Sequence, residues 1–179
     1  MNVFYWNWEF DWLYALQKIH NLVLDRVMAV LSDMGNAGIF WILLAVVLMI
    51  IRRTRPAGCQ MMLSIIITFV IGNLILKNAI MRARPCQIDE TVALLVAAPS
   101  DYSFPSGHSM NGFTAATALF YNNKKLGIPA LVLATLIAFS RLYNFVHFPT
   151  DVFFGIVLGT VVALAVCSVW NRTAKSNSL

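Results

Sequence analysis

The residues best suited to chemistry in this chain lie in three short polar stretches. The first holds Lys77 and Arg84, which are seven residues apart, and Pro85 follows directly. A spacing of seven is close to two helical turns, so both cations can project from one helix face toward a common point. Such a pair could bind an anion. The alternative is that the two side chains only extend to a membrane boundary and mark its position.

The second stretch, Pro105-Ser106-Gly107-His108, lies where a polar loop becomes an apolar segment. Proline is preorganised for a first helical turn, glycine permits close backbone approach, and the free N–H groups of a helix start bind anions. Ser106 adds a hydroxyl donor, and His108 adds a group that titrates near neutral pH. The alternative is a capped helix start with an incidental histidine.

The third stretch contains Arg141, His147 and Asp151. The spacing of four between His147 and Asp151 allows the carboxylate to accept a hydrogen bond from one ring nitrogen, which leaves the other nitrogen free to attack. A buried charge pair without reactivity is the alternative. Together the three stretches supply three cations, two histidines, one carboxylate and a helix start, and this combination predicts an anion-binding reaction centre.

The segments that must position these residues are typical of a membrane protein. Of the 179 residues, 59% are hydrophobic and 12% are charged, whereas soluble domains are about half apolar and about a quarter charged. We therefore predict an all-α, polytopic membrane bundle of about five transmembrane helices, formed by residues 37–171. Several apolar runs are shorter than the roughly 20 residues of a full span, so polar flanks must lie among the headgroups or inside the protein. The runs are 37–51, 56–76, 107–121, 126–139 and 152–169.

Residues 1–36 carry too many charges for a spanning helix, because each charge is costly at the bilayer centre. Their apolar residues recur at steps of three and four, and tryptophan and tyrosine crowd the beginning. This pattern predicts an amphipathic helix at the membrane interface with an aromatic belt. A helix packed against the rest of the bundle is the alternative. Residues 172–179 are expected to form a polar cytoplasmic tail.

The basic residues outside the three stretches predict the orientation in the membrane. Five spans place seven cations on one side without any acidic residue, and the positive-inside rule makes that side the cytoplasm. The three polar stretches then lie together on the extracytoplasmic side. The cations of the three polar stretches and the seven cytoplasmic cations account for the net charge of +5, so we expect no nucleic-acid partner. The seven cations are Arg52, Arg53, Arg55, Lys124, Lys125, Arg172 and Lys175.

The remaining sequence features argue against other kinds of site. The three cysteines show no paired spacing, which disfavours a disulfide framework or a zinc site. Lys18 is the first cation of the chain, so we do not expect a cleaved signal peptide.

The pattern Lys-x6-Arg-Pro, Pro-Ser-Gly-His and Ser-Arg-x5-His-x3-Asp resembles the three signature motifs of the type 2 phosphatidic acid phosphatases, in that order, over residues 76–151. The resemblance implies a membrane lipid phosphatase. It implies that His147 attacks phosphorus and forms a phosphohistidine, that Asp151 fixes its tautomer, and that His108 protonates the leaving oxygen and then activates water. It assigns the phosphate oxygens to Lys77, Arg84, Ser106, the Gly107 amide and Arg141.

We expect no cofactor and no metal, because side-chain cations would fill the role of Mg²⁺ and only Asp151 brings a carboxylate to the predicted centre. The preferred substrate is undecaprenyl diphosphate in the cell membrane, with phosphatidylglycerophosphate or phosphatidic acid as the alternative. A non-hydrolytic lipid phosphate transporter is a further alternative, although it has no need of a histidine paired with Asp151. The exact lipid and the oligomeric state stay open.

Overall fold

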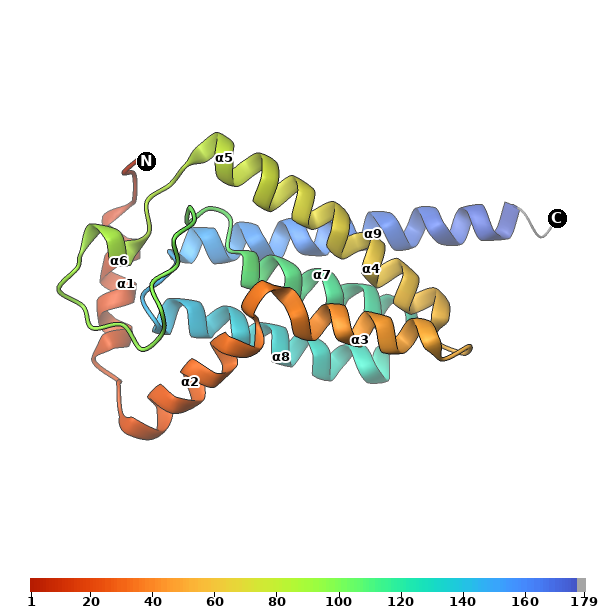
Figure 1. Ribbon diagram of the computed structural model, residues 1–179, viewed down its shortest axis with the longest axis horizontal. Helices are drawn as coiled ribbons and strands as arrows, with labels where there is room; N and C mark the ends of the chain where they lie inside the picture. Colours follow the sequence, from red (N-terminus) through yellow and green to blue (C-terminus); the bar gives the residue numbers. More distant parts are fainter. Residues whose placement is uncertain (177–179) are drawn as a thin grey trace.

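A bundle of helices running along one long axis makes up most of this protein (Figure 1). The computed structural model describes residues 1–176, apart from the side chain of Lys175. These residues contain no β-strand, only a single bridge between Asn2 and Arg82. The bundle consists of α3 (Ile39–Ile50), a rod made of α4 (Arg55–Phe69), the π-helical η2 (Val70–Leu76) and α5 (Lys77–Ile80), then α7 (Gly107–Asn122), α8 (Lys124–Tyr143) and α9 (Pro149–Ser176).

Helix α7 lies at the centre of the bundle and packs against α4, α8 and α9. Its approach to α9 is close because two glycines of α9 face it. A Cβ added at Gly159 would come within 2.4 Å of the Met110 carbonyl oxygen, and one at Gly155 within 2.8 Å of the Ser106 carbonyl oxygen. The backbones can therefore meet directly, which fixes the start of α7 beside the start of α9.

The expectation of an all-α membrane bundle is confirmed. Three helices of the described residues are long and apolar enough to cross a membrane by themselves: Arg55–Ile80, Lys124–Tyr143 and Pro149–Ala174. Helices α2 (Leu22–Met34) and α3 pass the same test only as a pair bent by 45°. Helix α7, with 16 residues, is shorter than a full span and largely buried by its neighbours. The protein thus crosses the membrane several times, with about five helices in the bundle.

The N-terminal segment forms two helices, α1 (Asn7–Gln17) and α2, where the sequence pattern predicted one. The chain breaks at Asn21, whose side-chain oxygen caps α2 by accepting a hydrogen bond from the Leu24 amide at 3.0 Å. Helix α1 has features of both alternatives given for this segment. Trp12 is exposed, as expected of an interfacial helix, whereas Leu13 is buried, as expected of a helix packed against the bundle. At the other terminus α9 continues through Ser176, so residues 172–176 of the predicted polar tail extend the last helix. Residues 177–179 of the predicted tail lie outside the described part of the chain.

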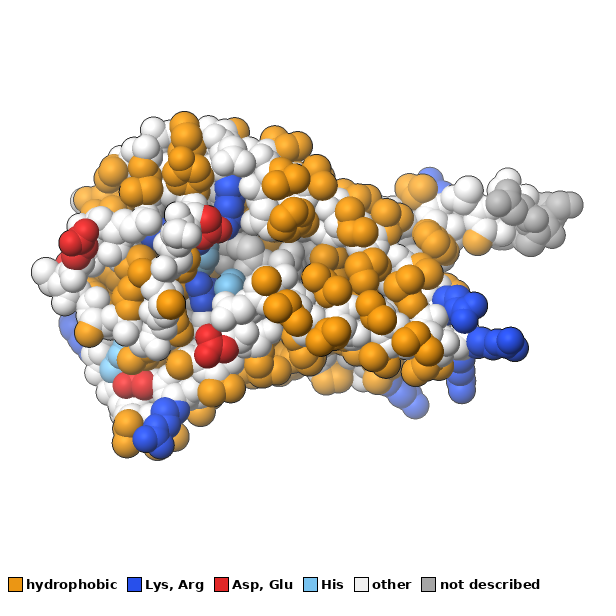
Figure 2. All heavy atoms as spheres, in the orientation of Figure 1, with side chains coloured by type: hydrophobic (Ala, Val, Ile, Leu, Met, Phe, Trp, Pro, Cys, Tyr) orange, Lys and Arg blue, Asp and Glu red, His pale blue; other side chains and the backbone are white. Residues whose placement is uncertain are grey.

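The two ends of the bundle differ in composition. At one end α1, α2, α6 (Pro85–Ile88) and the loop 89–106 gather around the starts of α7 and α9 (Figure 1). At the other end lie the turn between α3 and α4 and the start of α8, where Figure 2 shows a group of Lys and Arg side chains with no acidic side chain in view. Apolar side chains cover the surface between the two ends (Figure 2).

Candidate active site

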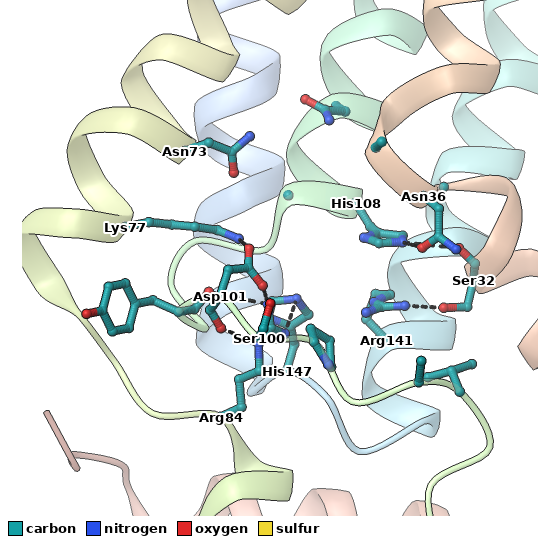
Figure 3. A pocket seen from close by; sticks show the side chains of 18 of the residues that line it. Ser32, Asn36, Asn73, Lys77, Arg84, Ser100, Asp101, His108, Arg141 and His147 are labelled. Carbon is teal, nitrogen blue, oxygen red and sulfur yellow. Dashed lines mark hydrogen bonds and ion pairs between the residues drawn. The ribbon is translucent and has the colours of Figure 1, made fainter. Parts of the chain in front are cut away.

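A cavity of about 810 Å³ opens at the end of the bundle that carries α1, α2 and the long loop. Figure 2 shows a hollow there with histidine and cationic side chains inside it, and Figure 3 shows the side chains that line it. Six of the eight predicted site residues line this cavity, and they come from all three polar stretches of the sequence. They are Lys77, Arg84, Gly107, His108, Arg141 and His147.

His147 lies at the bottom of the cavity with 1% of its side chain exposed. Its Nε2 is 3.0 Å from Nη1 of Arg84. A guanidinium can only donate hydrogen bonds, so this Nε2 is the unprotonated ring nitrogen and Nδ1 carries the proton. Burial lowers the pKa of His147 well below its ordinary range, and the charges of Arg84 and Arg141 lower it further. The structure therefore holds a neutral imidazole whose lone pair faces the cavity wall.

Asp151 lies behind His147 and does not line the cavity. Its Oδ2 is 3.6 Å from His147 Nδ1, longer than a good hydrogen bond. The same oxygen accepts from the Ser103 hydroxyl at 2.5 Å and from the Phe148 amide at 2.8 Å. Ser103 also lies 3.5 Å from His147 Nδ1. The structure places the ring beside the carboxylate without the predicted hydrogen bond between them, and Ser103, which the sequence reasoning missed, lies next to both.

Arg82 is the strongest partner of Asp151, and the sequence reasoning missed it as well. Its Nη1 donates to Asp151 Oδ1 at 2.6 Å, and its Nη2 donates to Glu9 Oε2 at 2.7 Å. Arg82 is 1% exposed, and both carboxylates are completely buried. The other oxygen of Glu9 accepts from the Thr150 hydroxyl at 2.6 Å. Helix α1 thus reaches the site through one buried chain of ion pairs, Glu9–Arg82–Asp151.

Sequence signals for these two residues existed. Arg82 is a further cation at the end of a membrane span, where charges are functional candidates by default. Glu9 is an acidic residue within an aromatic segment, and its burial requires a cationic partner. The partner lies 73 positions away in the chain, and no spacing rule connects residues at that distance.

Lys77 and Arg84 converge as predicted, but not on one helix face. The helix ends at Ile80, Met81 takes a left-handed conformation with φ of 50°, and Arg84 follows in extended backbone before Pro85. The predicted common helix face therefore does not exist. Both cations reach the same point of the cavity wall, where the carboxylate of Asp101 in the long loop pairs with both of them (Figure 3).

Asp101 corrects the expectation that only Asp151 brings a carboxylate to this centre. Its Oδ1 lies 2.6 Å from Arg84 Nη2, and its Oδ2 contacts the Lys77 ammonium. Partial burial by itself would raise the pKa of Asp101, but the charges of Arg84 and Lys77 outweigh this effect and hold the pKa below its ordinary value. Asp101 is therefore ionised at neutral pH. Even so, the described residues contain no group of three or more His, Cys, Asp or Glu side chains placed to hold a metal ion.

His108 lines the opposite wall of the cavity from Lys77 (Figure 3). Its Nε2 lies 3.1 Å from the Ser32 carbonyl oxygen and 3.1 Å from Asn36 Oδ1. Both partners are acceptors, so Nε2 carries the proton. Arg141 lies below His108 and donates to the Ser32 hydroxyl. Helix α2 and the 3-10 turn η1 (Asn36–Gly38) therefore form a wall of the site, which the sequence motifs do not indicate.

Ser106 differs from its prediction, because its side chain does not reach the cavity. The residue is completely buried, and its hydroxyl accepts a hydrogen bond from the Ser109 hydroxyl at 3.0 Å. Its amide donates to the Asp151 carbonyl oxygen at 3.0 Å and joins the starts of α7 and α9. Gly107 does line the cavity, with open space around it except for Asn73 Oδ1, 3.5 Å from an added Cβ.

Two polar atoms at the cavity wall are buried without a hydrogen-bond partner among the described residues. They are Nε of Arg141 and Oδ1 of Asn111. Buried polar groups in folded proteins are nearly always paired with protein groups or water. Arg141 therefore has a guanidinium donor without a protein partner among the described residues beside the cavity.

The family model of the PAP2 superfamily matches residues 57–175, about two thirds of the chain. This chain belongs to the PAP2 superfamily. An undecaprenyl-diphosphatase of Sulfolobus acidocaldarius is 34% identical over 141 residues, which cover 78% of this chain and 68% of that protein.

Two solved structures have the same fold. The crystal structure of a transmembrane PAP2-type phosphatidylglycerolphosphate phosphatase from Bacillus subtilis matches with a TM-score of 0.74 and 29% identity, covering 92% of this chain and 85% of that one. The crystal structure of Aquifex aeolicus LpxE matches with a TM-score of 0.78 and 26% identity, covering 91% and 96%. The expectation from the three motifs is confirmed: this PAP2 protein is a membrane lipid phosphatase.

Proposed function

We propose that this PAP2 phosphatase hydrolyses undecaprenyl diphosphate to undecaprenyl phosphate and inorganic phosphate, without a metal, on the extracytoplasmic face of the cell membrane. The observation that carries the proposal is the convergence of Lys77, Arg84 and Arg141 on one cavity beside a neutral His147. The likeness to an undecaprenyl-diphosphatase supports the choice of lipid. Three cations are also well matched to the additional charge of a diphosphate.

The first half of the reaction would use the unprotonated Nε2 of His147. This nitrogen gives up the hydrogen bond that it accepts from Arg84 and attacks the terminal phosphorus in line, a P–N bond forms, and the bond from phosphorus to the bridging oxygen breaks. His108 enters this step as an imidazolium, gives one proton to the leaving lipid phosphate and becomes neutral. Asp151, held by Arg82 and Ser103, stabilises the positive charge that develops on the ring of His147.

The second half returns both histidines to their first state. Neutral His108 accepts a proton from water, the water oxygen attacks the phosphohistidine, and the P–N bond breaks to release inorganic phosphate. In both halves the equatorial oxygens are held by Lys77, Arg84, Arg141 and the amide of Gly107, which are donors already in place. Ser106 would act through the backbone that joins α7 to α9, in place of the direct contact that the motifs implied.

The side of the membrane is inferred from the charge of the opposite end of the bundle. Arg52 and Arg53 lie in the turn between α3 and α4, and Lys124 begins α8, at the end away from the cavity (Figures 1 and 2). A basic end without acidic residues is typical of the cytoplasmic side. The side chain of Lys175, one of the seven predicted cations, lies outside the described residues. A membrane-impermeant thiol reagent should label a cysteine at Glu90 in intact cells and one at Lys124 only after permeabilisation.

Phosphatidylglycerophosphate is the second candidate substrate, favoured by the likeness to the Bacillus subtilis structure. Apolar side chains at the cavity, Phe69 and Val96 among them, suit a prenyl or an acyl chain equally. The deciding experiment measures kcat/KM for undecaprenyl diphosphate, phosphatidylglycerophosphate and phosphatidic acid in one detergent, with EDTA present throughout.

We expect undecaprenyl diphosphate to be cleaved most efficiently. A preference of about tenfold for a glycerophospholipid, or about 1.4 kcal/mol in the transition state, would reassign the substrate. Loss of activity in EDTA that Mg²⁺ restores would contradict the metal-independent mechanism. Hydrolysis of none of the three lipids would overturn the proposed function itself.

A further inference from the structure

Asp101 occupies the position that a phosphate group would need. Its two carboxylate oxygens each contact one cation of the pair, Oδ1 with Arg84 Nη2 at 2.6 Å and Oδ2 with Lys77 Nζ. Two oxygens of a phosphate would make the same two contacts. Arg84 also lies 3.0 Å from the attacking nitrogen of His147, so the carboxylate sits next to the reacting centre (Figure 3).

The exposure of the three side chains shows which of them can move. Lys77 is 7% exposed and Arg84 is 2% exposed, whereas Asp101 is 54% exposed. The cations are therefore buried in the wall, and the carboxylate approaches them from the open side of the cavity. Water can take over the contacts of such a carboxylate at low cost, whereas a cation without a partner would stay buried.

The backbone of the loop has its own attachment to Arg84. The Nε of Arg84 donates to the Asp101 carbonyl oxygen at 2.8 Å, and the Nη2 of Arg84 lies 3.3 Å from the carbonyl oxygen of Tyr102. The Ser103 amide in addition donates to the Arg82 carbonyl oxygen at 2.9 Å. The carboxylate can consequently leave by rotation of its side chain while the loop stays attached.

We propose that Asp101 is an internal competitor for the phosphate site. In the substrate-free protein it neutralises Lys77 and Arg84, it yields them to the phosphate group of the substrate, and it takes them back when inorganic phosphate leaves. This inference rests on the proposed role of Lys77 and Arg84 as phosphate ligands. Asp101 thereby sets the affinity for phosphate and favours substrates with more negative charge, since these compete better for the two cations.

The test compares binding of inorganic phosphate to the purified protein with binding to Asp101→Asn, by isothermal titration calorimetry in detergent. The variant should bind phosphate about tenfold more tightly, a change of about 1.4 kcal/mol, because the competing charge is gone and two buried cations are left to the ligand. Its KM should fall, and inorganic phosphate should inhibit it more strongly. Asp101→Glu, which keeps the charge, should resemble the unchanged protein.

Glu90→Gln is the matched control. Glu90 is exposed on the same loop, does not line the cavity and is in no ion pair among the described residues. Its neutralisation tests the general effect of removing one negative charge. We expect a change in phosphate affinity of less than about twofold, because a charge that is not in contact is screened by water.

Weaker or unchanged phosphate binding by Asp101→Asn would contradict the proposal. If Asp101 only positions the two cations, its neutral variant should bind phosphate more weakly or equally, and either result overturns the proposal. A structure of the unchanged protein with orthovanadate provides a test without any variant. Vanadate in the cavity with the Asp101 carboxylate displaced supports the proposal, and vanadate with both ion pairs intact overturns it.

The proposal and the proposed function can fail separately. If the unchanged protein hydrolyses a lipid phosphate while Asp101→Asn binds phosphate no more tightly, the function stands and the competitor role falls. If Asp101→Asn binds phosphate more tightly but no lipid phosphate is cleaved, the competitor role stands and the assigned reaction falls.

Discussion

The two sides of His147 have similar charges but different surroundings. On the cavity side Arg84 pairs with Asp101, which is 54% exposed. On the buried side Arg82 pairs with Asp151 and Glu9, both of which are completely buried. Both arginines are themselves buried, so their own exposure does not distinguish them. The two sides differ in the burial of the carboxylate. An exposed carboxylate leaves its arginine available to a ligand, whereas the buried carboxylates keep Arg82 in place behind His147.

The difference has an energetic basis. An ion pair with one exposed partner can exchange that partner for another anion, because water compensates the group that leaves. Separating a fully buried pair leaves a charge without a partner in a medium of low polarity, which typically costs about 3–5 kcal/mol. The cavity side is therefore suited to binding and release, and the buried side is suited to holding Asp151 in one position.

Replacing His147 itself should have the largest effect, because it removes the residue that joins the two sides. His147→Gln is expected to reduce kcat by about 10⁴-fold or more, while inorganic phosphate still binds because the cations remain. Phosphate release and phosphate binding are measured on the same preparation. His20→Gln, a histidine stacked on Tyr143 outside the cavity, is the control and should keep its activity. A fully active His147→Gln protein would contradict the mechanism.

Changing the two arginines tests the comparison directly. Arg82→Met leaves Glu9 and Asp151 without their cation, so we expect a loss of about 3–5 kcal/mol of stability and a decrease of about 100-fold in kcat, as misplaced catalytic groups produce. Arg84→Met should act mainly on KM and on phosphate affinity. Steady-state kinetics and thermal unfolding in detergent separate the two outcomes. If both variants changed KM alone, the division between support and binding would be wrong.

Helix α1 should contribute to catalysis through Glu9, although no family motif covers it. Glu9→Gln keeps the size of the side chain but removes one of the two negative charges around Arg82, and we expect kcat to fall about tenfold with KM little changed. Asp11→Asn on the same helix is the control, because Asp11 is exposed. Its kinetics should equal those of the unchanged protein. Equal effects of the two substitutions would reduce α1 to a general structural role.

The smallest effect concerns pH. Since burial lowers the pKa of His147 in the folded protein, the unfolded chain binds a proton at this residue more readily than the folded one. The contribution of His147 to the free energy of unfolding should therefore be complete above about pH 6.5, the ordinary histidine pKa. It should decrease as the pH falls below that value. An NMR titration of labelled histidine should give a midpoint for His147 below that of the denatured chain. A midpoint at or above about 6.5 would mean that the ring is not held neutral by its surroundings.

Much of the site could be predicted from residue types and order. The apolar runs predicted the all-α membrane bundle, and the three motifs predicted the family and the convergence of Lys77, His108 and His147. These features follow from short-range rules: hydrophobic length determines what can cross a bilayer, and spacing within a motif restricts where neighbouring side chains can point.

Only the tertiary structure decided which charges face each other. The helix after Lys77 ends at Ile80, so Arg84 reaches the cavity through extended backbone and not along a helix face. Asp101 and Glu9 find their cations across 17 and 73 positions of chain. Pairings over such separations depend on how helices pack, because each charge is paired by whichever element is folded against it. The sequence determined the reacting groups, and packing determined which of their counter-ions are buried and which can be exchanged.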